Sequence, residues 1–434
     1  MKKSSYLSAV VATPKGEVID LEGYAAVAMS GDSFFLIEQE MCQKLPFGTE
    51  LMFLPDRTPV AYNLKTRQLE ELLCNPYAPG ESIFPVAAFN SPGYLLAGTS
   101  AYVENKKTQI LSLFSYGAVG WFRDHFYSAS LLVDPEPRQD LRKMPVQKVK
   151  TGIFDLKKKY PQNRLITHLE KCALTYGCPA AKNFFLGRYE APLPTSKICN
   201  ARCVGCISLQ EGSSVSCCQE RIQFTPTPKE IAQVALFHIQ RVPDSIVSFG
   251  QGCEGEPLMA SNVIKPAIEK IRQATPKGTI NLNTNGSLPE QLEELLDVGL
   301  DSIRVSVNSF QPTAYAAYFR PKGYSFDDVL KSIRHALDRK KYVAINYLNC
   351  PGFTDTPEEQ EALFAFLKNY SVHLIQWRNL NFDPARYYAL MKRCVSMRAP
   401  LGVPSLLTQI RKTFPLIRFG YFNPPKERFF TTGT

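Results

Sequence analysis

Three cysteines stand close together in the segment KICNARCVGC, where Cys199, Cys203 and Cys206 form a C-x3-C-x2-C array. Three thiolates can hold three irons of a [4Fe–4S] cluster and leave the fourth iron without a protein ligand, whereas electron-transfer clusters normally use four cysteines. A structural zinc site is the alternative, because Cys203 and Cys206 with Cys217 and Cys218 would also supply four thiolates. The array therefore predicts a metal centre, with an iron–sulfur cluster favoured over zinc.

The other cysteines leave more than one interpretation open. The chain has 12 cysteines, and their crowding in one stretch argues for metal binding rather than disulfides in a reducing compartment. Cys172, Cys178, Cys217 and Cys218 are either ligands of a second iron–sulfur cluster or ordinary thiols, and their role stays open. Cys253 is either a hydrogen-atom donor or, as we favour, a small buried residue. The histidines show no H-x3-H spacing, so we expect them to be structural.

The strands and helices that position the array are predicted from the alternation of short β-branched segments with longer amphipathic segments. Strands are predicted at 245–249, 279–283, 302–307, 342–348 and 372–377, and helices at 227–241, 261–274, 288–298, 325–340 and 357–370. With a first strand running into Cys199, these segments make six βα-like units. Such alternation predicts an α/β fold with a partial (βα)6 TIM-like barrel. Chemistry is then expected at the C-terminal ends of the strands, where the array lies.

The array after an opening strand, followed by βα repeats, resembles the radical S-adenosylmethionine (SAM) superfamily. The resemblance covers about residues 190–380, and PTSKICNARCVGCISLQ, VSFGQGCEGEPL and TINLNTNGS resemble an uncharacterised bacterial subgroup with an N-terminal extension. It implies a [4Fe–4S] cluster on Cys199, Cys203 and Cys206, with SAM chelating the open iron. Reductive cleavage of SAM would then give a 5′-deoxyadenosyl radical that removes hydrogen from a substrate.

Further matches to the family follow the later strands. The resemblance assigns SAM contacts to Gly255, Glu256, Pro257, Asn283, Ser306 and Asn308. The segment NYLNCPGFTD after the fifth strand resembles the adenine-facing stretch of the family. Three positions depart from the pattern: Gly205 replaces an aromatic residue, Glu254 replaces a glycine, and Asn308 replaces a frequent acidic residue. No catalytic residue is identified.

Around this core the sequence predicts three further regions. Residues 1–140 read as strand–turn–strand units and predict a mostly β domain that docks substrate over the barrel mouth. Residues 141–185 are predicted as a basic connector and helix, 186–380 as the radical SAM core, and 381–434 as a C-terminal region covering the core.

The distribution of charge along the chain indicates which kinds of partner the protein could bind. The net charge is +10, and residues 141–166 hold eight Lys and Arg against Asp155 alone. This run is either a solvated linker, as charge runs usually are, or a patch for an acidic partner such as RNA. Substrate candidates are a protein or peptide, an RNA or nucleotide, and a small metabolite, with a flavodoxin or ferredoxin as reductant. Gln376, Arg378 and Asn379 are predicted either as substrate contacts or as members of ordinary salt bridges.

The sequence therefore predicts a radical SAM enzyme with an unidentified substrate. The alternative is a non-catalytic iron–sulfur or zinc protein that binds nucleic acid through the basic connector and the β domain. No apolar run approaches the length of a spanning helix, and the N-terminal apolar stretch is too short for a secretory signal, so we expect a cytoplasmic protein without membrane partners.

Overall fold

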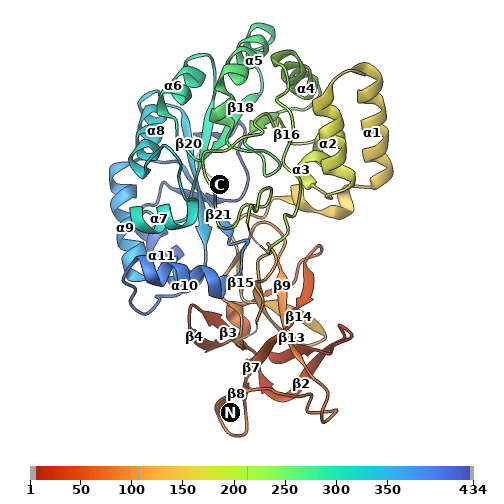
Figure 1. The fold of residues 1–434 in the computed structure, drawn as a ribbon, viewed down its shortest axis with the longest axis vertical. Helices are drawn as coiled ribbons and strands as arrows, with labels where there is room; N and C mark the ends of the chain where they lie inside the picture. Colours follow the sequence, from red (N-terminus) through yellow and green to blue (C-terminus); the bar gives the residue numbers. More distant parts are fainter. Residues whose placement is uncertain (1–5, 106–107, 213, 431–434) are drawn as a thin grey trace.

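The computed structural model describes residues 6–105, 108–212 and 214–430. Figure 1 shows two bodies, an antiparallel β domain from the red and orange part of the chain and an α/β body from the green and blue part. None of the helices in these ranges combines the length and apolar composition of a bilayer-spanning segment. The predicted fold class, an α/β body on a parallel sheet with an N-terminal mostly β domain, is confirmed.

The β domain contains a 13-stranded antiparallel sheet and a separate pair of strands, β10 with β15. The sheet is made of β1 (Ser8–Ala12), β2 (Val18–Ala25), β3 (Val27–Ser30), β4 (Ser33–Leu36), β5 (Gln43–Lys44), β6 (Glu50–Phe53), β7 (Arg57–Asn63), β8 (Gln68–Glu71), β9 (Phe84–Phe89), β11 (Thr99–Ser100), β12 (Tyr102–Glu104), β13 (Gly117–Phe122) and β14 (His125–Ser128). The pair is β10 (Tyr94–Leu96) and β15 (Ser130–Leu132).

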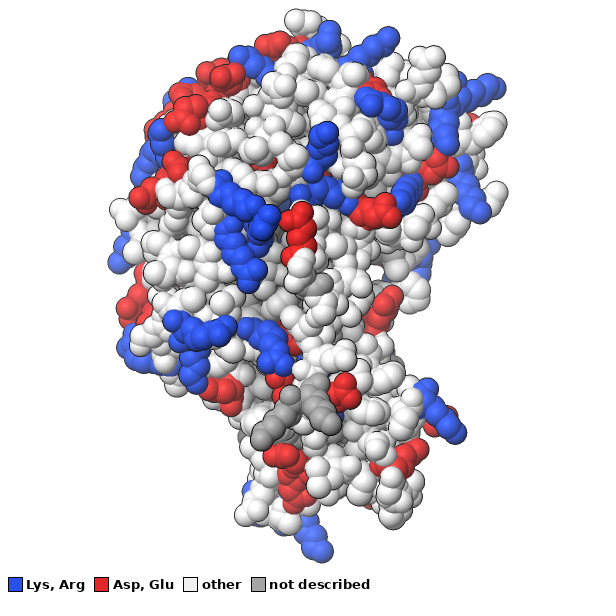
Figure 2. All heavy atoms as spheres, in the orientation of Figure 1, with Lys and Arg blue, Asp and Glu red and all other residues white. Residues whose placement is uncertain are grey.

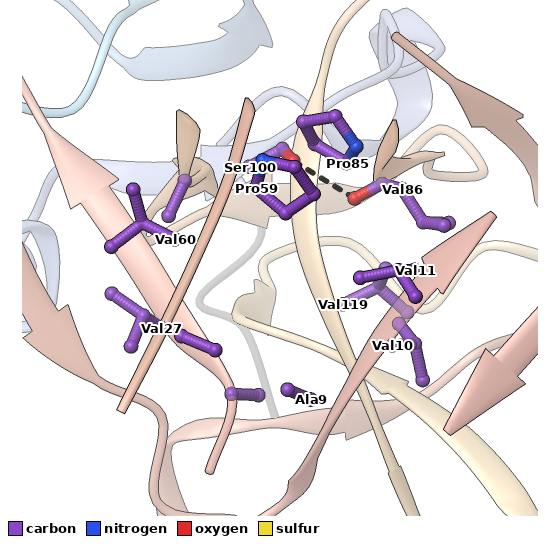
Figure 3. Close-up of a pocket in the computed structure, with 13 residues that line it drawn as sticks. Ala9, Val10, Val11, Val27, Pro59, Val60, Pro85, Val86, Ser100 and Val119 are labelled. Atoms are coloured by element: carbon purple, nitrogen blue, oxygen red, sulfur yellow. Dashed lines mark hydrogen bonds between the residues drawn. The ribbon is translucent and has the colours of Figure 1, made fainter. Parts of the chain in front are cut away.

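The interior of the β domain is packed rather than hollow. Figure 3 shows a cavity of about 20 Å³ lined by apolar side chains of β1, β3, β7 and β9. The Ser100 hydroxyl on its wall donates to the Val86 carbonyl at 2.9 Å, so this polar group is already satisfied. A space of this size holds about one water molecule. This cavity is therefore part of the core and not a substrate pocket.

Three helices follow the β domain: α1 (Val146–Lys159), α2 (Arg164–Leu174) and α3 (Pro179–Phe185). The basic run is not an extended linker, because α1 occupies most of it. Val149, Ile153 and Leu156 recur at helical spacing and are buried in the main core, which holds this helix against α2 and α3. The lysines occupy the opposite face, and Figure 2 shows Lys and Arg at the outer edge of the molecule near α1.

The α/β body is built on seven parallel strands in sequence order, without pairing between the first and the last. They are β16 (Glu190–Pro192), β17 (Ile246–Phe249), β18 (Thr279–Thr284), β19 (Ser302–Val307), β20 (Tyr342–Asn349), β21 (Leu374–Asn379) and β22 (Arg418–Gly420). Two features differ from the prediction. The first strand ends at Pro192 and does not run into Cys199, and β22 from the C-terminal region adds an unpredicted seventh strand beside β21.

The helices of the α/β body are α4 (Pro228–Arg241), α5 (Ser261–Ala274), α6 (Pro289–Asp297), α7 (Pro312–Phe319), α8 (Phe326–Asp338), α9 (Pro357–Asn369), α10 (Pro384–Cys394) and α11 (Val403–Thr413). Five of them, α4, α5, α6, α8 and α9, begin within one residue of their predicted starts, whereas α7, α10 and α11 were not predicted. Thr227 and Ser325 form capping boxes at the starts of α4 and α8, and the Thr356 hydroxyl accepts the Glu359 amide at the start of α9. Local sequence therefore fixes these helix starts.

The two faces of the parallel sheet differ in chemistry. One face joins the main core with the helices through Val247, Ile280, Leu282, Ile303, Val305, Val343, Ile345, Ile375 and Trp377. The other face carries polar side chains that bond to one another, namely Asn281, Asn283, Arg304, Ser306, Asn346, Gln376 and Arg378. Parallel sheets are usually apolar on both faces. The polar inner face is therefore a candidate lining for a site.

The β domain contacts the C-terminal ends of β20 and β21. The Asn379 side chain accepts the Leu96 amide at 2.9 Å and donates to the Tyr94 carbonyl at 2.8 Å, and the Asn349 side chain donates to the Leu96 carbonyl. A buried ion pair between Arg57 and Asp383, 3.0 Å apart, joins the bodies beside these bonds. The β domain thus sits at the edge of the sheet where chemistry is expected.

Candidate functional site

The three-cysteine array lies in the loop between β16 and α4 and is held from the side by α7. The Arg202 amide donates to the Phe319 carbonyl at 2.9 Å, and the Val204 amide donates to the Tyr318 carbonyl at 3.0 Å. Both acceptors are carbonyls of the last turn of α7. The backbone of the cysteine loop is therefore fastened to the end of this helix.

The thiols of Cys199, Cys203 and Cys206 are each partly exposed and lie near enough to affect one another's ionisation. Burial raises the pKa of Cys199 to about 11, and Glu256 adds to the rise. Burial raises the pKa of Cys203 well above its usual value, with further contributions from Cys199 and Cys206. Three cysteines gathered here fit a group that binds thiolates and brings positive charge, as an iron–sulfur cluster does.

Arg221 is a residue of this site that sequence reasoning missed. Its guanidinium donates to the Cys206 sulfur at 3.6 Å and to the Ser208 hydroxyl at 3.3 Å, and it is buried. Arg221 therefore places a buried cation beside the sulfur of the third cysteine. Arg221 lies 15 residues after Cys206, and no spacing rule pointed to it.

Gly205 occupies the position where the family usually has an aromatic residue, and neighbouring side chains fill the space. A Cβ at this position would lie 2.9 Å from the Tyr318 hydroxyl and 3.2 Å from the Asn381 carbonyl oxygen. Tyr318, from α7, therefore takes the space beside the third cysteine. An aromatic ring is present near Cys206, but it comes from a different element.

Glu254 organises the loop after β17. One carboxylate oxygen accepts the amides of Thr195 and Ser196 at 2.8 and 2.9 Å, and the other accepts the amides of Gly250 and Gln251 at 2.6 and 2.9 Å. Burial raises the pKa of this carboxyl to about 7, and the four amide bonds oppose the rise. The side chain joins the loop after β17 to the segment that leads into the cysteines.

Gly255 and Glu256 continue this connection. Their amides donate to the carbonyls of Ser196 and Ile198 at 2.7 and 2.9 Å, and a Cβ at Gly255 would lie 1.9 Å from the Ile198 carbonyl oxygen. Only glycine allows this approach. The Glu256 carboxylate accepts the amides of Leu258 and Asn285 and a hydroxyl bond from Thr284 at 2.5 Å. The predicted Gly-Glu-Pro turn therefore lies directly beside Cys199.

Burial raises the pKa of Glu256 to about 7, although its hydrogen bonds lower it. Pro257 begins the short helix η4 (Pro257–Ala260) and is buried. As SAM contacts these residues stay predictions.

The three remaining predicted SAM contacts do not share one environment. The Asn283 side chain donates to the Phe249 carbonyl at 2.9 Å, and the Ser306 hydroxyl accepts from Asn346 at 3.2 Å, both on the inner face. Asn308 is fully buried, and its amide nitrogen lies 3.2 Å from the Tyr387 hydroxyl. Its carbonyl oxygen has no partner among the described residues. Asn308 thus lies among α7 and α10, beyond the end of β19.

Two arginines on the inner face have no carboxylate within ion-pair distance in the described part of the chain. Arg304 donates to the Gln376 side chain at 2.8 Å, and its Nε has no partner there. Arg378 donates to the Asn346 side chain at 2.8 Å and stacks on the Tyr421 ring. Burial and the neighbouring Arg378 lower the pKa of Arg304 to about 9. Both residues keep part of their surface accessible.

Of the three residues predicted as substrate contacts at β21, only Arg378 is partly free to meet a ligand. Gln376 is buried and bonds to Arg304 and Asn423, and Asn379 is used in the contact with β10. The predicted adenine-facing stretch is also packed. A Cβ at Gly352 would lie 2.0 Å from the Gly31 amide nitrogen of the β domain. The loop after β20 is therefore closed by the β domain.

A second sulfur group lies behind the loop after β17. The Cys172 sulfur is 3.6 Å from the His168 Nε2, and donor atoms of His168, Cys172 and Cys253 all lie within 4.8 Å of one another. Sequence reasoning grouped Cys172 with Cys217 and Cys218, but the latter two are exposed. The H-x3-C spacing on α2 was the signal that was overlooked, because side chains four residues apart share a helix face.

Comparison with known families gives one match, to the model described as Radical SAM superfamily, over residues 193–367. The matched region begins just before the cysteine array and ends within α9. It contains every residue assigned above to the cysteine loop and to the SAM contacts.

Curated relatives align over the same part of the chain. A GTP 3′,8-cyclase of Limosilactobacillus fermentum is 26% identical over 43% of this chain and 52% of its own length. The FeMo cofactor biosynthesis protein NifB of Klebsiella pneumoniae is 26% identical over 38% of each chain. The molybdenum cofactor biosynthesis protein 1 of Bos taurus is 29% identical over 35% of this chain and 23% of its own. The chain thus spans about half or less of these relatives.

Solved structures align with parts of this chain at low sequence identity and low TM-score. HydG, a maturase of the [FeFe]-hydrogenase, aligns over 65% of both chains with 17% identity and a TM-score of 0.38. SuiB of Streptococcus suis, bound to the precursor peptide SuiA, aligns over 53% of this chain and 48% of its own with 14% identity and a TM-score of 0.37.

Proposed function

We propose that the protein is a radical SAM enzyme acting on a small anionic substrate held on the inner face of the parallel sheet, because residues 193–367 match the model of the Radical SAM superfamily. Cys199, Cys203 and Cys206 are the proposed ligands of a [4Fe–4S] cluster. When bound, the cluster and SAM would supply the one-electron chemistry that removes a hydrogen atom from the substrate. The observation that carries the proposal is the position of the three thiols beside the Gly-Glu-Pro turn.

The chain's own residues prepare this site in three ways. Backbone bonds to α7 hold the cysteine loop, and Arg221 places a buried cation beside the Cys206 sulfur. Glu254 and Gly255 fasten the turn to the segment before Cys199. Gly255, Glu256, Pro257, Asn283, Ser306 and Asn308 are the proposed SAM contacts. The polar and backbone groups near the cysteines are therefore held in place before any ligand arrives.

Arg304 and Arg378 support an anionic substrate. Two neighbouring guanidinium groups without a carboxylate partner repel each other, which costs free energy in the folded state. An anion bound between or beside them would remove this cost. Carboxylate and phosphate are the anions that arginine binds with two parallel hydrogen bonds. The named substrate of the GTP 3′,8-cyclases is also an anion, which agrees with this class.

The β domain is proposed to close the site. It bonds to the last residues of β20 and β21 through Leu96 and Tyr94, and its turn at Gly31 packs on the loop after β20. A radical intermediate has to be shielded from solvent. The β domain, fixed at this edge, supplies that shield. A larger substrate would enter at this edge only by displacing the β domain.

The reductant and the location of the protein belong to the same proposal. A flavodoxin or ferredoxin would deliver the electron, and the cytoplasm would protect an oxygen-sensitive centre. A non-catalytic iron–sulfur or zinc protein is disfavoured, because the family match extends through the sheet to α9 and beyond the cysteine loop. The lysines of α1 remain available to an acidic protein partner such as the electron donor.

The test is anaerobic reconstitution with iron and sulfide followed by reduction with dithionite in the presence of SAM. The proposal expects a brown protein that forms 5′-deoxyadenosine and methionine, and a Cys199→Ala, Cys203→Ala, Cys206→Ala variant that forms neither. Full cleavage activity in that triple variant would overturn the cluster assignment. A colourless zinc-loaded wild-type protein would overturn the enzyme itself.

The substrate class is tested by deuterium transfer into 5′-deoxyadenosine from a deuterated cell extract separated by anion exchange. We expect the active fraction to bind the anion-exchange resin, and the Arg304→Met and Arg378→Met variants to lose the transfer but keep uncoupled SAM cleavage. The exposed Arg393→Met variant, on α10, is the matched control. Activity confined to the unbound fraction would contradict the anionic class.

A further inference from the structure

We propose that His168, Cys172 and Cys253 form a second metal site that binds a single zinc ion. His168 and Cys172 lie one turn apart on the same face of α2, and Cys253 comes from the loop after β17. The Nε2 of His168 is 3.6 Å from the sulfur of Cys172, and the three donor atoms lie within 4.8 Å of one another. Among the described residues, no other three His, Cys, Asp or Glu side chains form so close a group.

The spacing of the donors suits one ion. Zinc binds sulfur at about 2.3 Å and nitrogen at about 2.0 Å in tetrahedral geometry, so two donors on one zinc are about 3.5–3.8 Å apart. The His168 Nε2 and the Cys172 sulfur, 3.6 Å apart, already have this spacing, and side-chain rotations would bring the other pairs, which lie within 4.8 Å, to it. The cysteines of the array Cys199, Cys203 and Cys206 do not form a group this close. The two sulfur groups therefore suit different kinds of metal centre.

The donor types and the charge also suit zinc. Thiolate and imidazole together are the common ligands of zinc in proteins. Binding of Zn²⁺ by the two thiols releases two protons, and the resulting pair of thiolates balances the charge of the ion. Cys172 is 1% exposed and Cys253 is 6% exposed, so a neutral complex is what this environment accepts.

The protein around the donors is already fixed. The Ile222 amide donates to the Cys253 carbonyl at 2.8 Å, which holds the loop, and the His168 ring lies edge-on to Phe224. The Cys178 amide donates to the Cys172 carbonyl at 2.9 Å, and its thiol interacts electrostatically with both cysteines of the site. Cys178 lies outside the close group.

The position of the site indicates its role. Cys253 immediately precedes Glu254, which joins the loop after β17 to Thr195 and Ser196, and Glu256 lies beside Cys199. A zinc ion on Cys253 would anchor this loop to α2, in the helical segment that precedes the parallel sheet. The proposed zinc thus fastens the turn that faces the first metal centre to a rigid helix.

The test measures metal content after anaerobic purification from zinc-supplemented medium and exhaustive dialysis against EDTA. We expect about one zinc per chain in the wild-type protein, as for a structural site. The Cys172→Ser and Cys253→Ser variants should each retain less than about a tenth of this, and Cys217→Ser, an exposed thiol, should retain all of it. The Cys199→Ala, Cys203→Ala, Cys206→Ala variant should also keep its zinc, so failure of the cluster assignment leaves this test intact.

X-ray absorption at the zinc edge of the wild-type protein keeps the test independent of whether the variants fold. The proposal expects sulfur and imidazole scattering in the first shell. It is overturned by a wild-type protein without zinc, by zinc that persists in both cysteine variants, or by a first shell of oxygen only. A Cys172–Cys253 disulfide in the zinc-grown protein, seen as a loss of two mass units, would overturn it as well.

Discussion

The two sulfur groups of this protein differ in almost every physical respect. The array of Cys199, Cys203 and Cys206 lies on a loop, is partly exposed, and is spread too widely to share one ion without movement. The group of His168, Cys172 and Cys253 is compact and joins two elements far apart in sequence. A spread, open set suits a cluster that must bind a substrate, whereas a closed set suits a structural ion. The difference teaches that cysteine count alone does not assign a metal.

The largest effect is expected when the ligands of one sulfur group are replaced and those of the other are kept. Replacing Cys199, Cys203 and Cys206 by Ala should lower SAM cleavage to the background of a protein-free control and leave zinc unchanged. Replacing Cys172 by Ser should remove zinc and leave iron on the array. Iron, sulfide and zinc are measured in both variants, and loss of both metals from either one would break the distinction between the groups.

Zinc removal should act on stability. A ligand present at about 1,000 times its dissociation constant stabilises the folded state by about 4 kcal/mol. We therefore expect a strong chelator to lower the urea midpoint of the wild-type protein and of the Cys199→Ala, Cys203→Ala, Cys206→Ala variant equally. Equal midpoints with and without the chelator would contradict a structural ion.

Glu256, beside the array of Cys199, Cys203 and Cys206, should make the free energy of unfolding fall as pH rises. Burial raises its pKa from 4.5 to about 7, so its folded form holds a proton that the unfolded form has lost between these values. The corresponding contribution to the free energy of unfolding is fully present below pH 4.5 and is lost as pH rises through about 7. Its full size is about 3 kcal/mol. Glu256→Gln should flatten this slope in urea unfolding from pH 5 to 8. An unchanged slope would show that Glu256 does not titrate there.

Arg304, on the inner face of the parallel sheet, belongs to the surroundings of the cysteine array and not to those of the group of His168, Cys172 and Cys253. Removing a deep cation without a carboxylate partner should stabilise the apoprotein, and we expect about 1–2 kcal/mol for Arg304→Met. The same change should abolish substrate-derived deuterium in 5′-deoxyadenosine. Destabilisation in urea would mean that Arg304 serves the fold, because Gln376 keeps its bond to Arg378 in the variant.

The smallest effect is expected at Gly205. A methyl group there would meet the Tyr318 hydroxyl at 2.9 Å, so Gly205→Ala should cost about 1–2 kcal/mol. Removing the hydroxyl with Tyr318→Phe should recover part of that cost in a double-mutant cycle. Additive effects in the cycle would show that Tyr318 does not fill the place of the missing aromatic residue.

Local sequence patterns predicted most of the α/β body. The strand at 302–307 and the helix at 261–274 have the predicted bounds, because alternation and capping are properties of neighbouring residues. The strand β22 was missed because three residues, Arg418–Gly420, carry no period of their own and pair only through β21. The basic run was a helix because Val149, Ile153 and Leu156 supply a buried face that the lysines obscured.

The site was predictable to the extent that its residues follow one another along the chain. The cysteine array and the Gly-Glu-Pro turn are local patterns, and the structure brings them together through bonds between Ser196, Ile198, Gly255 and Glu256. Arg221, Tyr318 and the approach of Cys253 to Cys172 depend on how distant segments pack. No single-sequence pattern encodes such contacts.

The central claim is that the array leaves one iron open for SAM. The most direct measurement is electron-nuclear double resonance on the dithionite-reduced, reconstituted protein with SAM carrying ¹⁵N in its amino group. The expected result is a ¹⁵N hyperfine coupling to the cluster, which is replaced by a ¹⁴N coupling when unlabelled SAM is used. A reduced [4Fe–4S] signal that shows no coupling and no change on addition of SAM would contradict it.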